Sequence, residues 1–304
     1  MSAEPVPMQI RVPATSANLG AGFDCLAVAF NLWNQAVVEF KGKGYRVIVK
    51  GEGEGVLPEN EENLIVKSFQ YALKALKIKP PVGAEFTCEN NIPLGSGLGS
   101  SAAAVLIGVI AATTLKPDTE NKDTWLQLSA GLEGHADNVA AAIYGGLVAV
   151  RKSEGHFKTL LYDVEPDTAI VVLPDIDLPT RTTRAALPKT IPMTDAVMNI
   201  ACIPAILDGM RMGDVDLLRD GFDDHIHQPY RLPLIPGAAE AIQAANRIGA
   251  AAALSGAGPS VIAFLPVDND ATTAAMSRCF EDHNIRHRIF HLEMINRGAQ
   301  VTRL

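Results

Sequence analysis

The chain has 304 residues, of which 48% are hydrophobic and 20% are charged, a normal composition for a globular protein with a sizeable core. Its net charge of −8 at pH 7 and its lack of any Lys- or Arg-rich run exclude a nucleic-acid-binding surface. No leader-like start is visible, and no apolar stretch reaches the roughly 18 residues of a membrane span. We therefore expect a soluble, cytoplasmic protein with no nucleic-acid or membrane partner.

The cysteines and histidines do not suggest a metal centre. The four cysteines lie far apart and form no CxxC pair: Cys25, Cys88, Cys202 and Cys279. We expect them to be buried thiols in a reducing compartment. The histidines at 225–227 and 283–291 lack a third converging ligand, so we interpret both groups as structural or solvated.

The first third of the chain is rich in predicted strands. Apolar residues alternate with polar ones at 9–12, 35–40, 45–49 and 82–88. Between the last two strands, apolar residues recur at helical spacing over 63–76, and Asn63 is a suitable N-cap. The acidic segment 51–55 is typical of a hairpin or loop tip.

The middle of the chain predicts two helices and a change of domain. Residues 100–115 are apolar nearly all round, which indicates a helix buried on most faces. A second helix is expected over 123–143, before a strand at 147–151, and the polar stretch that follows is a candidate junction. We place the domains at 1–155 and 156–304, with nucleotide binding in the first.

The second half mixes strands and helices. Strands are expected at 169–174, 251–254, 261–266 and 288–293, and helices at 194–212, 238–248 and 270–283. Because the two kinds of element do not follow a strict βαβα order, the pattern favours the α+β class over a doubly wound sheet.

The segment between the last strand of the first third and the buried helix carries the clearest chemical signal. It contains three alternating glycines and two serines at the start of the helix: Pro93, Leu94, Gly95, Ser96, Gly97, Leu98, Gly99, Ser100 and Ser101. Glycines let backbone N–H groups approach a ligand, and a helix N-terminus favours an anion. A plain turn would need one glycine, so the segment predicts a triphosphate loop, in which a Cβ at Gly97 would block the phosphates. Neither GxxxxGK[ST] nor GxGxxG is present.

This loop resembles the phosphate loop of the GHMP kinase superfamily, named for galactokinase, homoserine kinase, mevalonate kinase and phosphomevalonate kinase. The segment 254–260, LSGAGPS, is similar to the third motif of that superfamily, and 13–24, PATSANLGAGFD, is similar to the N-terminal signature of its homoserine kinase branch. Two more segments, 133–139 and 227–231, resemble the same branch, although Ala136 stands where proline is common.

The resemblance implies the GHMP kinase fold, with two α+β domains and the ATP site in the cleft between them. It also implies an ATP- and Mg²⁺-dependent phosphorylation of the side-chain hydroxyl of L-homoserine, giving O-phospho-L-homoserine in threonine biosynthesis. A homodimer is a habit of the family. Two alternatives stay open: a kinase of the same superfamily for another small alcohol, resembling mevalonate, a sugar or shikimate, and a nucleotide-binding regulator without catalysis.

Roles for individual residues follow from the resemblance. Gly256 and Gly258 would lie against the phosphate loop, Glu133 with Ser100 or Ser101 would hold Mg²⁺, and Thr180 would lie near the γ-phosphate. The substrate would contact seven polar side chains: Asn18, Asp24, His135, Asp137, Asn138, Arg184 and Arg231. We assign the two arginines to the substrate carboxylate, because a guanidinium fork matches its two oxygens. Asp24 and Asp137 are candidates for the ammonium and the hydroxyl, and we prefer a positioning role for Asp137 over that of a general base.

Overall fold

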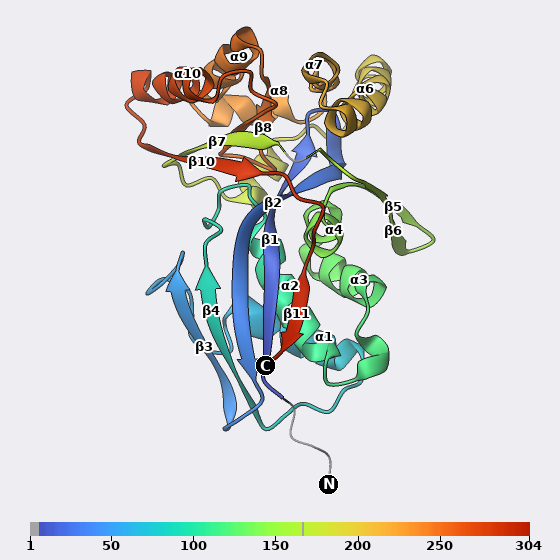
Figure 1. The fold of residues 1–304 in the computed structure, drawn as a ribbon. Helices are drawn as coiled ribbons and strands as arrows, with labels where there is room; N and C mark the ends of the chain where they lie inside the picture. The colour runs from blue at the N-terminus through green and yellow to red at the C-terminus, as the bar shows by residue number, and fades with distance from the viewer. Residues whose placement is uncertain (1–5, 166) are drawn as a thin grey trace.

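The computed structural model describes residues 6–165 and 167–304, and two β-sheets organise it (Figure 1). The first sheet has the strand order β11-β1-β2-β4-β3, and β5 pairs with both β2 and β6. Its strands are β1 (Met8–Leu19), β2 (Gly22–Glu39), β3 (Gly44–Gly51), β4 (Gly83–Asn90), β5 (Leu147–Ser153), β6 (His156–Tyr162) and β11 (Gln300–Arg303). Every strand predicted in the first third of the sequence is confirmed.

The hairpin of β1 and β2 carries the N-terminal motif at its tip. The register of this antiparallel pair shifts at Pro13/Ala14 and again at Ala17/Leu19, so the ladder is interrupted near the turn. Asn18 and Asp24 adopt the left-handed conformation, with φ of 56° and 53°. Non-glycine residues in this strained conformation cluster at functional sites.

Four helices accompany the first sheet: α1 (Leu64–Ala75), α2 (Ser100–Thr113), α3 (Lys122–Glu133) and α4 (Asp137–Tyr144). Helix α1 connects β3 to β4, which are parallel, so the acidic tip at 51–55 is a turn and not a hairpin. The amide oxygen of Asn63 caps α1 as predicted, accepting a hydrogen bond from the N–H of Ile65 at 3.0 Å. Helix α2 is buried along most of its length, also as predicted.

The single helix expected over 123–143 is wrong. Helix α3 ends at Glu133 because Gly134 adopts a left-handed C-cap with φ of 81°, and α4 begins at Asp137. The break exposes the end of one helix and the start of the next at the same place. It therefore presents Glu133, His135 and Asp137 from a turn and not from one continuous face.

The second sheet has the order β10-β7-β9-β8, from β7 (Thr168–Pro174), β8 (Ala251–Leu254), β9 (Val261–Phe264) and β10 (His287–Glu293). Helices α9 (Ala238–Ile248) and α10 (Asn269–Asp282) pack against it. The other helical segments of this half are α5 (Thr180–Ala185), α6 (Met193–Met212), α7 (Val215–Gly221), α8 (Gln228–Arg231) and the 3₁₀ turn Leu232–Leu234; another 3₁₀ turn, Pro117–Thr119, precedes α3. The strands and the three long helices predicted here are confirmed, and the α+β class with them.

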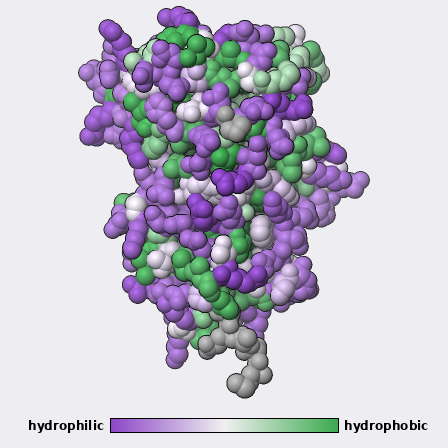
Figure 2. Space-filling view, viewed as in Figure 1, coloured by the Kyte–Doolittle hydropathy of each residue, from purple (hydrophilic) through white to green (hydrophobic). Residues whose placement is uncertain are grey.

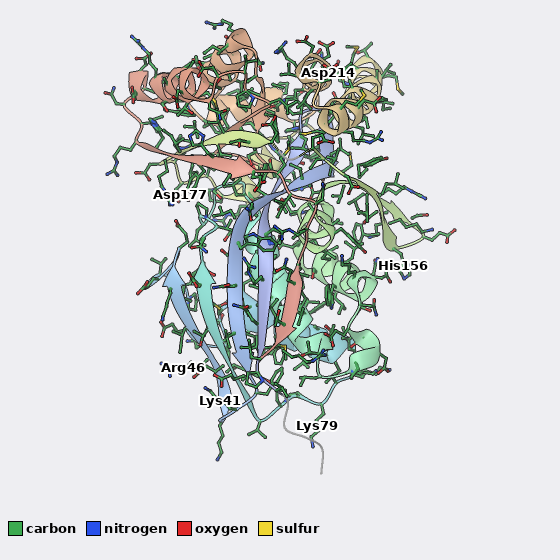
Figure 3. All side chains as sticks on the ribbon, in the orientation of Figure 1. Lys41, Arg46, Lys79, His156, Asp177 and Asp214 are labelled. Atoms are coloured by element: carbon green, nitrogen blue, oxygen red, sulfur yellow. The ribbon has the colours of Figure 1, made fainter. Side chains whose placement is uncertain are left out.

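One core joins the two sheets. Phe30 of β2 stacks on Phe264 of β9 with ring centroids 6.2 Å apart. The predicted boundary between residues 155 and 156 stays a prediction. It falls in the turn of the β5–β6 hairpin, which carries His156 at the side of the molecule (Figure 3), and β11 returns the C-terminal residues to the first sheet.

Helix α6 is the one helix of the described residues that is long and apolar enough to cross a membrane, by length and composition only. That is weak evidence for a span, and Asn199 and Met210 of the helix pack inside the protein. Its outer side leaves apolar residues such as Val197 and Ile200 exposed, in a region where Figure 2 shows pale green among purple.

The cysteines differ in burial from the expectation. Only Cys88 is buried; Cys25, Cys202 and Cys279 are partly exposed, and all four are free thiols. Cys88 belongs to β4, which has a neighbouring strand on each side, whereas Cys25 lies in β2, Cys202 in α6 and Cys279 in α10. The expectation of four buried thiols was therefore wrong for three of them.

Candidate active site

The phosphate loop lies between β4 and α2. Gly95, Gly97 and Gly99 all have positive φ, at 61°, 78° and 75°, which explains why glycine recurs at alternate positions. Gly99 is the N-cap of α2 and gives no side-chain cap, so the first N–H groups of the helix remain available to a ligand. Ser96 stabilises the loop from within, because its hydroxyl donates a hydrogen bond to Pro93 O at 2.8 Å.

The turn at 254–260 packs directly on this loop. The hydroxyl of Ser255 donates to Gly97 O at 2.8 Å and lies 2.9 Å from the hydroxyl of Ser16. A Cβ at Gly97 would collide with the carbonyl oxygen of Ser255. The expectation that a side chain at Gly97 would block the phosphates is therefore corrected: it would separate two packed loops. Gly95 differs, because a Cβ there would meet nothing within 4 Å.

A cavity of about 120 Å³ lies at the start of α2 and collects almost all of the predicted site residues. It is lined by Asn18, Asp24, Gly95, Ser96, Gly97, Gly99, Ser100, Ser101, Glu133, His135, Asp137, Asn138, Thr180, Arg184, Arg231, Gly256 and Gly258, together with Ala102 and Ala257. Three predicted loop residues are not in its wall. Pro93 and Leu94 line an adjoining groove, and Leu98 is buried in the core.

The acidic side of the cavity comes from the break between α3 and α4. Ser101 donates a hydrogen bond to Glu133 Oε1 at 2.7 Å. Asp137, only 1% exposed, accepts through Oδ1 from His135 Nδ1 at 2.9 Å and from the Asn138 N–H at 2.8 Å. The hydrogen bond to Asp137 raises the pKa of His135.

Another part of the cavity wall holds an ion pair that links the two halves of the chain. Arg184 of α5 donates to both carboxylate oxygens of Asp24, at 2.9 and 2.8 Å. Asn18 fixes the position of Asp24 by accepting its backbone N–H at 2.9 Å. A carboxylate and a guanidinium thus lie side by side in the cavity wall.

Arg231 is a buried cation of the site, as little exposed as Asp137. It is 1% exposed and donates through Nη1 to His227 Nδ1 and to Gly256 O, both at 3.3 Å, while its Nε has no hydrogen-bond partner in the described chain. Burial, followed by the neighbouring Arg184, lowers the pKa of Arg231 to about 10, so the guanidinium remains charged at neutral pH. A buried donor without an acceptor is costly, and an anionic ligand would satisfy it.

Sequence reasoning missed the groups that support this arginine and a second pocket behind the phosphate loop. Phe23 and His227 contact Arg231. Both lie in the motifs at 13–24 and 227–231, but no role was assigned to them from the sequence. The second pocket, of about 210 Å³, shares Gly95, Ser100 and Ser101 with the first. Its other walls are mostly apolar: Asn34, Val49, Leu57, Pro58, Asn63, Leu64, Ile65, Cys88, Asn90, Leu94, Ala104 and Ile107. From the sequence, only the loop residues of this pocket, Leu94, Gly95, Ser100 and Ser101, were assigned to a ligand, and Asn63 only to the cap of α1.

No group of three or more His, Cys, Asp and Glu side chains within residues 6–165 and 167–304 is arranged to hold a metal ion. The charged side chains Lys41, Arg46 and Lys79 lie at the end of the first sheet that is remote from the second half, away from the cavity (Figure 3). The loop, the acidic turn and the two arginines are among the polar groups that the cavity wall offers to a ligand.

A glycine loop at a helix N-terminus, an acidic turn beside it and a packed second glycine turn define the class of the GHMP kinases. The sequence models of this family match the chain: the model of the GHMP kinase N-terminal domain matches residues 63–146, and that of the C-terminal domain matches residues 203–282. A homoserine kinase of Moorella thermoacetica is 38% identical over 96% of this chain and 99% of its own length. A homoserine kinase of a Synechococcus species is 37% identical over 95% of this chain and 94% of its own length.

The solved structures agree with the sequences. The crystal structure of homoserine kinase from Cytophaga hutchinsonii matches with a TM-score of 0.84 and 30% identity, over 99% of both chains. The chain belongs to the homoserine kinase family of GHMP kinases.

Proposed function

We propose that the chain transfers the γ-phosphoryl group of ATP to the side-chain hydroxyl of L-homoserine. The observation that carries this assignment is the pairing of Asp24 with Arg184 in the same cavity as buried Arg231, whose Nε has no hydrogen-bond partner in the described chain. An α-amino acid carries an ammonium and a carboxylate on one carbon, so its receptor needs an anionic and a cationic group side by side. Mevalonate and sugars lack the ammonium that Asp24 would bind.

Binding of the amino acid would exchange partners within the pair. The substrate ammonium would take one oxygen of Asp24, and the α-carboxylate would accept from Arg184 and from Nε of Arg231. This exchange costs Asp24 and Arg184 little, because each of the two keeps an opposite charge throughout, and Arg231 gains one. Burial is the largest cause of the lowered pKa of Arg231, and repulsion by Arg184 is the next; a carboxylate between the two guanidiniums would relieve that repulsion.

The nucleotide would occupy both pockets that meet at the phosphate loop. Its phosphates fit the cavity at the N-terminus of α2, where the N–H groups of the first turn are free. The base fits the apolar pocket behind Gly95, whose walls include the amide side chains of Asn63 and Asn90. Gly95 lines both pockets, so the ribose would pass this residue.

Mg²⁺ is the cation that fits the oxygen ligands of the acidic turn. The hydroxyl of Ser101 and the carboxylate of Glu133 are 2.7 Å apart, which is close enough for both to serve one ion with water and phosphate oxygens. When bound, the ion would neutralise charge on the phosphates. Replacing Glu133 by Gln should raise the Mg²⁺ concentration needed for half-maximal rate; unchanged dependence on Mg²⁺ would move the ligand elsewhere.

Asp137 is suited to positioning the substrate hydroxyl. Both of its hydrogen bonds from the protein go to Oδ1, and we expect Oδ2 to accept from the hydroxyl. His135 donates to the same carboxylate, which stabilises its charge and reduces its strength as a base. Thr180, at the start of α5, would lie near the transferred group, where a loose transition state needs positioning more than proton abstraction.

A panel of alcohols tests the substrate class. Release of ADP should be fastest with homoserine and slow with mevalonate, with a sugar and with the deaminated and decarboxylated analogues of homoserine. Equal rates for the analogues would favour another small-alcohol kinase, and ATP binding without turnover on any alcohol would favour a regulator. The cytoplasmic location and the homodimer that the family habit implies stay predictions; light scattering in solution tests the second.

A further inference from the structure

Arg231 is held in the site by groups that carry no negative charge. Its hydrogen bonds go to a histidine ring and to a backbone carbonyl, both at 3.3 Å, which is long for a charged donor. Arg184 lies on the same cavity and repels it. Arg184 is held by its ion pair with Asp24, but something else must keep the buried side chain of Arg231 in the orientation that a ligand requires.

The ring of Phe23 contacts both guanidinium groups. The Cζ atom of Arg231 lies 5.2 Å from the ring centroid, and that of Arg184 lies 5.8 Å from it. Both distances are within the range of a cation–π interaction, which is strongest where the cation is desolvated. The left-handed conformation of the next residue, Asp24, breaks the alternation of β2, so Phe23 and Asp24 can both contact Arg184.

His227 supports the same ring and the same arginine. Its ring stacks on Phe23 with centroids 5.4 Å apart and an interplanar angle of 25°. Its Nε2 lies 2.8 Å from Gly20 O, and because a carbonyl only accepts, Nε2 must carry the proton. Nδ1 is then free to accept from Arg231, and burial, which lowers the pKa of His227, keeps the ring neutral.

The backbone on both sides of His227 is held by hydrogen bonds to Asp224. Asp224, which is buried, accepts the N–H groups of Ile226 and His227 at 3.0 Å and that of Gln228 at 2.6 Å. Asn199 of α6 donates to the same carboxylate at 2.7 Å. The start of α8 therefore has a rigid base from which the imidazole reaches Phe23 and Arg231.

We propose that Phe23 is a positioning residue for the substrate carboxylate: its ring holds Arg231 and Arg184 in place, and neutral His227 orients the ring and Arg231. This inference rests on the proposed role of the two arginines. It assigns to Phe23 no contact with the nucleotide and none with the transferred phosphoryl group. Its loss should therefore affect recognition of the carboxylate alone, whereas a merely structural role would affect both substrates.

The test compares Phe23→Leu, which keeps an apolar side chain without an aromatic face, with Phe23→Tyr, which keeps the face. We expect Phe23→Leu to raise KM for homoserine about tenfold and to change KM for ATP less than about twofold. The decarboxylated analogue, an aminopropanol, should react equally well with both variants and the unmodified protein. The preference for homoserine over this analogue would thus fall about tenfold in Phe23→Leu only.

A second pair of variants at His227 keeps the test decisive if Phe23→Leu does not fold. Asn places an amide near the position of Nδ1 and can still accept from Arg231, whereas Gln reaches toward Gly20 O and leaves Arg231 without this acceptor. His227→Gln should lose the preference for the carboxylate, and His227→Asn should keep most of it.

Two results would overturn the inference. One is an unchanged preference for homoserine in both Phe23→Leu and His227→Gln; the other is an equal rise of KM for homoserine and ATP. Failure of the proposed function would give a different result, because the unmodified protein itself would then not phosphorylate homoserine.

Discussion

At the scale of single residues, the two arginines carry the specificity of the site. Replacing Arg184 or Arg231 by Leu should raise KM for homoserine far more than KM for ATP, because the substrate carboxylate would lose a charged, directional partner. The loss should be about 2–5 kcal/mol, or roughly 30-fold to several-thousand-fold in binding. Lysine should restore only part of it, since an ammonium lacks the planar fork. Steady-state kinetics with both substrates decides, and a change confined to ATP would contradict the assignment.

His135 gives the site a pH-dependent contribution to stability. Because the hydrogen bond to Asp137 raises its pKa in the folded state, the contribution is fully present below the unfolded pKa of about 6.5 and is lost as pH rises through the folded pKa. Gln at this position does not titrate. The stability advantage of the unmodified protein over His135→Gln should therefore shrink as the pH rises from below about 6.5 into the alkaline range. Urea unfolding across that range measures it, and a constant or growing difference would be inconsistent with the pair.

Most of the site residues that could be predicted from the sequence stand in a motif that resembles the family. Arg231 was predicted from its place in HQPYR, and the cavity brings it to the other predicted residues. The support from Phe23 and His227 could not be predicted, because a stacked ring and a neutral tautomer depend on where Gly20 and Arg231 lie in space. An isolated histidine in a sequence has no signal that distinguishes these states.

At the scale of elements, the phosphate loop and the turn at 254–260 form one packed unit. Two alanine variants distinguish the contribution of the unit to stability from its contribution to ATP binding. Gly95 and Gly97 both have positive φ, so a Cβ at either position costs a similar backbone strain of about 1–2 kcal/mol. Gly97→Ala adds a collision with Ser255 O, so we expect a lower melting temperature. Gly95→Ala meets open space, so it should fold and bind ATP more weakly.

Calorimetry and nucleotide titration of the two variants give the comparison. A Gly95→Ala protein with unchanged ATP affinity would contradict the placement of the phosphates beside this glycine. If Gly97→Ala were as stable as Gly95→Ala, the packing of the two loops would contribute little.

Most elements were predictable because their apolar period is regular over the whole segment. The break between α3 and α4 was not, since apolar residues continue on both sides of Gly134 and no proline marks the end of the helix. Glycine within a helical pattern is tolerated often enough to leave the choice open. The short helices α5, α7 and α8 were missed because fewer than eight residues cannot show a helical period.

At the scale of the whole molecule, the site is assembled from both halves of the chain. The phosphate loop and the acidic turn belong to the first sheet and its helices, and Arg184, Arg231 and the turn at 254–260 come from the second half. The return of β11 to pair with β1 could not be read from the sequence, because four residues at the C-terminus have no pattern that names a partner 289 positions away, as in the pairing of Arg11 with Gln300.

Ligands should stabilise the two halves together. A ligand at 100 times its Kd adds about 2.7 kcal/mol to the free energy of unfolding. We expect ATP with Mg²⁺ and homoserine each to raise a single, cooperative melting transition. Arg231→Leu should abolish the shift with homoserine and keep the shift with ATP. Two separate transitions, of which ATP moved only one, would show that the halves unfold independently.

The most direct test of the account is the product itself. Purified protein with homoserine, ATP and Mg²⁺ should yield ADP and a phosphorylated amino acid in equal amounts, and fragmentation in the mass spectrometer should place the phosphoryl group on the side-chain oxygen. Arg231→Leu protein should form this product far more slowly at the same homoserine concentration. Phosphate on the carboxylate or amine, release of inorganic phosphate without product, or no consumption of ATP would each contradict the assignment.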